Sequence, residues 1–158
     1  MNPIENASND ASGNEYLTFR MGEEEYAIDI LRVREIRALT PVTRIANSAP
    51  AMKGIFDLRG SIVPVFDMRI LLGLAPCEVA NPVVIILDID GRPAGIVVDT
   101  VRQVVALERG AVKPVPSVST VVDADCIRGA TQQDDGMLIV LDIVRVMQSL
   151  EAPAAEAA

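Results

Sequence analysis

The chain is built from short runs of β-branched residues, and this feature limits its fold more than any other. It contains 20 valines and 15 isoleucines against 5 aromatic residues, none of them tryptophan. Ten glycines and ten prolines interrupt these runs at short intervals. Because β-branched side chains favour strands and glycine and proline favour turns, the pattern predicts a β protein of short strands. No apolar run reaches ~18 residues, the length of a membrane-spanning helix, so direct membrane insertion is not expected.

Ten strands and two helices are expected in a single domain over residues 15–150, between flexible tails at 1–14 and 151–158. Each helix follows an aspartate, Asp67 or Asp142, whose carboxylate can accept hydrogen bonds from the first free N–H groups of the helix. The first helix is predicted over 68–74, and the second is predicted to end near Leu150. The strands are expected at 15–21, 25–29, 33–39, 54–59, 61–66, 82–89, 94–99, 101–107, 126–131 and 137–141.

The two halves of this domain share a pattern. Residues 62–71 and 137–146 each read as a strand, an aspartate and a helix, and Arg59-Gly60 is paired with Arg128-Gly129. The offsets between matched segments run from 68 to 75 residues, which indicates a diverged repeat. Five short antiparallel strands bury an apolar face and lose their exposed edges by curling into a barrel. We therefore predict an all-β fold of two five-stranded barrels, with subdomains at about 15–80 and 81–150. A single sandwich of seven to ten strands is the alternative.

The charged and nucleophilic residues exclude several classes of function. The net charge is −8 and no basic stripe is present, so nucleic-acid binding is not expected. The chain has no histidine, its two cysteines (Cys77 and Cys126) lack metal-binding spacing, and no glycine-rich phosphate loop occurs. The acidic clusters fall at predicted turns, where solvated carboxylates are the simpler interpretation. We therefore expect a binding module without cofactor or metal, with a small hydrolase as the weaker alternative.

Several motifs, in a constant order, resemble CheW-type chemotaxis coupling proteins. The most specific are Val33-Arg-Glu-Ile36 and Leu58-Arg-Gly60, at this separation. The others are Tyr16-Leu-Thr-Phe-Arg-Met-Gly22, Val42-Thr-Arg-Ile-Ala-Asn47, Ile62-Val-Pro-Val-Phe-Asp67, Val83-Val-Ile-Ile-Leu87, Ala94-Gly-Ile-Val-Val-Asp99, Val112-Lys-Pro-Val-Pro116 and Met137-Leu-Ile-Val-Leu-Asp142. The resemblance covers about residues 15–150 and implies two SH3-like barrels with a hydrophobic core between them.

The resemblance also implies a function and its partners. CheW proteins are non-catalytic adaptors that join the cytoplasmic hairpin tips of chemoreceptors to the histidine kinase CheA, within membrane-associated arrays. The implied localisation is therefore cytoplasmic, with recruitment to those arrays. The CheW-like half of a CheV-type regulator is the alternative, disfavoured because no receiver pattern follows in this sequence.

The resemblance assigns partner contacts residue by residue. Glu35 and Arg59 match the charged residues implicated in coupling. Lys113 and Val118 match a contact with the kinase, where valine departs from the bulkier residue that the family often has. The remaining matched positions surround the groove between the barrels: Val33, Gly54, Gly60, Gly95 and Val104.

Overall fold

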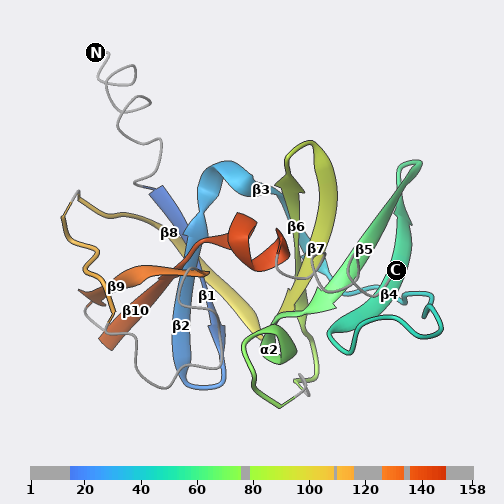
Figure 1. Ribbon diagram of the computed structural model, residues 1–158, viewed down its shortest axis with the longest axis horizontal. Helices are drawn as coiled ribbons and strands as arrows, with labels where there is room; N and C mark the ends of the chain where they lie inside the picture. Colours follow the sequence, from blue (N-terminus) through green and yellow to red (C-terminus); the bar gives the residue numbers. More distant parts are fainter. Residues whose placement is uncertain (1–14, 76–78, 109, 116–125, 134–135, 149–158) are drawn as a thin grey trace.

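The computed structural model describes residues 15–75, 79–108, 110–115, 126–133 and 136–148, and all ten predicted strands occur among them (Figure 1). The predicted tails lie outside the described residues, as do Cys77 and Val118. The strands are β1 (Glu15–Met21), β2 (Glu24–Asp29), β3 (Val33–Ala38), β4 (Met52–Leu58), β5 (Ser61–Asp67), β6 (Val83–Ile89), β7 (Arg92–Val98), β8 (Thr100–Ala106), β9 (Ile127–Gln133) and β10 (Gly136–Leu141).

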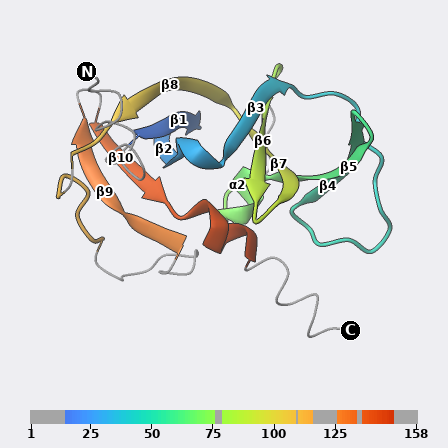
Figure 2. The same cartoon turned by 90° about the horizontal axis from the view of Figure 1, so that it is seen from above.

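These strands form two five-stranded sheets that stand side by side (Figure 2). One sheet, called barrel A below, has the order β8-β1-β2-β10-β9, and the other, barrel B, has the order β3-β6-β7-β5-β4. Neighbouring strands are antiparallel except for β2 with β10 and β5 with β7, which are parallel. The prediction of two five-stranded sheets is thus confirmed, with one parallel pair in each.

The sheets do not follow the predicted division near residue 80. Barrel A combines the first two strands with the last three, whereas barrel B is formed from β3 to β7. The sequence repeat is nevertheless present, because β1–β5 and β6–β10 occupy equivalent places in the two orders. Each repeat contributes a hairpin to one barrel and three strands to the other. The division was mispredicted because a repeat reveals equivalent segments but not which copies pair.

Two backbone bridges close the curled sheets. Thr43, beyond β3, pairs with Ile55 of β4, and Lys113, beyond β8, pairs with Ala130 of β9. In each bridge a glycine comes directly before the bridged residue of β4 or β9. A Cβ on Gly54 would lie 2.5 Å from the carbonyl oxygen of Thr43, and a Cβ on Gly129 would lie 2.3 Å from the carbonyl oxygen of Lys113. Only glycine allows the backbones to approach this closely. Gly129 is therefore equivalent to Gly54 in the repeat, and the prediction that Gly129 corresponds to Gly60 was wrong.

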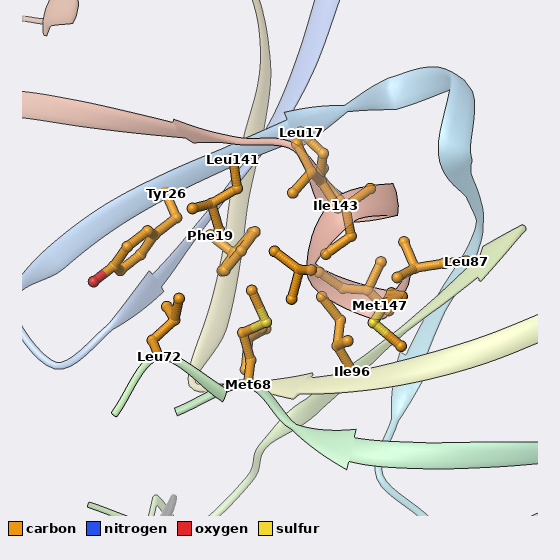
Figure 3. Packing of buried hydrophobic residues seen from close by; sticks show 14 of the residues in the cluster. Leu17, Phe19, Tyr26, Met68, Leu72, Leu87, Ile96, Leu141, Ile143 and Met147 are labelled. Atoms are coloured by element: carbon orange, nitrogen blue, oxygen red, sulfur yellow. The ribbon is translucent and has the colours of Figure 1, made fainter. Parts of the chain in front are cut away.

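The described residues form three hydrophobic cores, and the largest lies between the barrels. Along β6, Val84 and Ile86 point into barrel B, while Ile85 and Leu87 point into the central core. Because side chains alternate across a strand, a strand buried on both faces reads as a continuous apolar run. Figure 3 shows side chains of both barrels converging in this central core, among them Phe19, Met68, Ile96 and Leu141.

Two short helical segments cover this central core. Helix α2 (Met68–Leu71) begins after Asp67, whose Oδ1 accepts the Arg69 N–H at 3.0 Å. A second segment, 143–148, begins after Asp142, whose Oδ1 accepts the Arg145 N–H at 3.2 Å. Both predicted caps are confirmed, while the predicted end near Leu150 lies outside the described residues. Among the described residues, no helix has the length and apolarity needed to cross a membrane.

Candidate functional site

An exposed cluster of charges lies on barrel B, where β3 meets the turn between β4 and β5. Arg59 and Gly60 form this two-residue turn and have φ values of 50° and 93°. Two successive positive φ values are typical of the type I′ turn, whose twist matches that of the strands it connects. The Gly60 N–H donates to Asp57 Oδ1 at 3.1 Å, which holds the turn closed. The turn thus directs the Arg59 side chain toward β3.

Glu35 of β3 accepts two arginines at once. Its Oε1 lies 2.5 Å from Arg59 Nη2, and its Oε2 lies 3.4 Å from Arg37 Nη1. The hydrogen bond from Arg59 is the main reason that the pKa of Glu35 is lowered from its ordinary value. The Arg59 side chain is 70% exposed, against 31% for Glu35, so the guanidinium faces solvent while Glu35 fixes its position. The two residues predicted from the resemblance are therefore direct partners.

The third charge in this cluster, Arg37, was missed from the sequence. Its guanidinium lies 5.5 Å from the ring centroid of Phe56 on β4, within the range of a cation–π contact. The signal was present, because Arg37 follows Glu35 by two positions and residues at that spacing share one face of a strand. We call Glu35, Arg37, Phe56 and Arg59 the charge cluster of barrel B.

Three other predicted positions on barrel B are buried or partly buried in the fold. Gly54 is buried beside the Thr43 carbonyl, and Gly95 is buried in β7. A Cβ on Gly95 would lie 3.1 Å from Val84 Cγ1, inside the barrel core. Val33 is partly buried against the central core. A substitution at these three positions would first disturb packing, so any effect on a partner would be indirect.

The remaining predicted positions lie on barrel A. Val104 on β8 is 52% exposed, and Lys113, whose backbone pairs with Ala130, is also exposed. Val118 lies outside the described residues. The structure thus gathers Glu35, Arg59 and Gly60 at one place and puts Val104 and Lys113 on the other barrel.

The described residues carry opposite net charges on the two barrels. Those between 30 and 98, which include all of barrel B, contain eight Arg or Lys and five Asp or Glu. Those in 15–29 and 99–148, which include all of barrel A, contain five Arg or Lys and eight Asp or Glu. Within the part of the chain that the structure describes, no three His, Cys, Asp or Glu side chains form a potential metal site.

Fold and surface together define a two-barrel β protein with an ordered, exposed charge cluster. The sequence pattern of the CheW-like domain matches residues 15–151. The chain therefore belongs to the CheW-like family.

Relatives and a solved structure agree over most of the chain. A chemotaxis protein CheW of Klebsiella aerogenes is 41% identical over 142 residues, which is 88% of this chain and 84% of that protein. A probable chemotaxis protein CheW of Rhizobium etli is 30% identical over 142 residues, covering 89% of this chain and 92% of that one. The crystal structure of the scaffolding protein TtCheW from Thermoanaerobacter tengcongensis superposes with a TM-score of 0.77 at 30% identity, covering 84% of this chain and 86% of that one. The chain is thus similar to CheW proteins over most of its length.

Proposed function

We propose that this protein couples chemoreceptors to the histidine kinase CheA as a non-catalytic adaptor, and that the charge cluster of barrel B contacts a partner. The observation that carries the proposal is the ion pair between Glu35 and Arg59, because both residues match the family's coupling positions and Arg59 remains 70% exposed. A guanidinium held in place by one carboxylate loses little conformational freedom when a second acidic group binds it.

The proposed partners follow from the family resemblance. The cytoplasmic tip of a chemoreceptor and the CheW-like regulatory domain of CheA are the two proteins to be joined, which would recruit this chain to the receptor arrays. Val104 and Lys113 on barrel A, together with Val118, are the proposed additional contacts. Separate surfaces on two barrels allow one small protein to hold two partners at once.

Charge reversal tests the proposal. Arg59→Glu and Glu35→Lys each place a like charge against the complementary surface of a partner, which is costly at a docked interface. We expect both variants to lose co-sedimentation with receptor membranes and CheA and to lose kinase activation in a reconstituted assay. Circular dichroism and thermal melting should show an intact fold, because exposed charge changes usually alter stability by no more than about 0.5 kcal/mol.

A swapped variant separates partner contact from the internal ion pair. Glu35→Lys with Arg59→Glu keeps opposite charges facing each other but reverses their polarity toward a partner. We expect this double variant to remain as inactive as the single ones. Arg102→Glu is the matched control, since Arg102 forms a 3.8 Å ion pair with Glu25 on barrel A. Full kinase activation by the swapped variant would show that the two residues matter only to each other.

A further inference from the structure

A network of polar contacts connects the two barrels beside the central core. Arg69 comes from α2, which follows β5 of barrel B, and Asp99 lies where the chain passes from β7 of barrel B to β8 of barrel A. Gly22 belongs to the β1–β2 turn of barrel A. Figure 1 shows α2 between this turn and β7. Residues far apart in sequence therefore meet where the two barrels adjoin.

The ion pair in this network is short and partly buried, whereas the hydrogen bonds of Gly22 and Ala75 lie nearer to solvent. Asp99 Oδ2 lies 2.9 Å from Arg69 Nη1 and accepts the Gly22 N–H at 2.8 Å. The side chains of Arg69 and Asp99 are 20% and 12% exposed. Arg69 Nε also donates to the Ala75 carbonyl at 2.9 Å, and the Asp99 N–H donates to the Arg20 carbonyl at 3.2 Å. One carboxylate thus connects α2 of barrel B with the β1–β2 turn of barrel A.

The repeat shows that this network is not required by the fold. By the strand registers, Leu31 corresponds to Asp99, and by the offset of the strand–aspartate–helix segments Val144 corresponds to Arg69. Asp29 lies at the other crossing between barrels, and its Oδ1 accepts the N–H of Leu31 at 2.9 Å, two residues along the chain. The crossing at Asp29 is thus built with a local cap, whereas the crossing at Asp99 uses two charged side chains and one backbone N–H from three different segments.

The two kinds of contact between the barrels restrain different motions. Hydrophobic burial opposes separation of the barrels but is non-directional, so it resists small rotations less. Hydrogen bonds to charged groups depend on angle and distance and therefore favour one orientation. From these contacts we infer that Arg69, Asp99 and Gly22 form a clasp that sets the angle between the two barrels. The inference concerns the free chain and does not depend on the proposed function.

Distance measurements between the barrels test the clasp. Ile62 of β5 and Met137 of β10 are 60% and 55% exposed and lie on opposite barrels, so cysteines at these positions, in a background lacking Cys77 and Cys126, can carry spin labels. We expect Arg69→Met and Asp99→Ala to broaden the distance distribution measured by pulsed electron paramagnetic resonance. Arg92→Met, which changes an exposed arginine of β7, is the matched control and should leave the distribution unchanged.

Amide exchange gives a second, residue-specific readout. The Gly22 amide should exchange roughly tenfold faster in Asp99→Ala, since it loses a hydrogen bond to a charged acceptor. The Gly91 amide, which donates to Asp88 Oδ1 at 2.8 Å within its own turn, should not change. The inference would be overturned if Arg69→Met and Asp99→Ala were folded and their distance distributions were as narrow as that of Arg92→Met. Loss of the fold in both clasp variants would overturn it too, because the network would then hold the fold itself.

Discussion

The two barrels share one strand order but differ in what they present to solvent. Barrel B is the more basic among the described residues and has an ordered cluster in which Glu35 binds two arginines. Barrel A is the more acidic and exposes Met137 at the position equivalent to Ile62 on barrel B. Gly54 and Gly129, in contrast, are the same residue with the same close backbone contact. These two glycines have thus stayed alike, whereas the charges on the surfaces of the two barrels have diverged.

Alanine at the two equivalent glycines should give the largest loss of stability. We expect Gly54→Ala and Gly129→Ala each to lower the free energy of unfolding by about 4 kcal/mol, because a Cβ would strike a backbone carbonyl at a positive φ. Urea denaturation would measure this loss. Gly60→Ala is the control for the positive φ alone, since its φ is 93° but no atom lies within 4 Å of its Cβ position, and it should cost clearly less. A small effect at only one of the two glycines would break the equivalence of the barrels.

Truncation inside either barrel should destabilise both barrels together. We expect Leu138→Ala in barrel A and Ile86→Ala in barrel B to cost about 3 kcal/mol each, since both side chains are fully buried. Because each barrel contains strands from both repeats, unfolding should occur in one transition. Tyrosine fluorescence and far-ultraviolet circular dichroism, followed in urea, should give coincident curves. Two separate transitions would show that the barrels fold independently.

The pKa of Glu35 should show whether the charge cluster of barrel B is formed in solution. Arg59 lowers the pKa of Glu35, so the pair stabilises the fold above the unfolded-state pKa and loses this contribution as the pH falls through the folded-state pKa. A carboxyl titration followed by nuclear magnetic resonance should give a midpoint below 4.5, the ordinary value. In Arg59→Gln the midpoint should move upward. An unchanged midpoint would mean that the ion pair does not persist in solution.

The exposed apolar side chains at the two equivalent strand starts should have the smallest effect. Ile62→Ser and Met137→Ser are expected to alter the free energy of unfolding by no more than about 0.5 kcal/mol, because both side chains are more than half exposed. Thermal melting of the two variants beside the wild type would measure this change. A loss of several degrees in one variant alone would reveal a packing role that the other barrel lacks.

The sequence predicted the strands well because their signals are local. Runs such as 83–89 are rich in valine and isoleucine and end at a turn, Asp90-Gly91, in which both residues have positive φ values. Sheet membership was mispredicted because it depends on pairing across the whole chain, as between β1 and β8. No local pattern states whether a strand pairs within its own repeat.

The candidate site divided in the same way. The resemblance identified Glu35 and Arg59, and the structure places them in contact. It could not separate a surface position from a packing position, so buried Gly95 was grouped with exposed Gly60. Phe56 was missed because its contact with Arg37 spans two strands, whereas Arg37 was missed although its spacing from Glu35 was a local signal. Contact of Glu35 and Arg59 with a partner stays a prediction, which the charge-reversal variants test.

The exchange of strands between repeats has a consequence for a chain cut between β5 and β6. Neither fragment would hold a complete barrel, since each keeps a hairpin of one sheet and three strands of the other. Each fragment would expose unpaired strand edges and half of the central core. Two copies of one fragment could satisfy these edges only by trading strands, as in a domain-swapped dimer. The present fold has the architecture of such a dimer joined into a single chain.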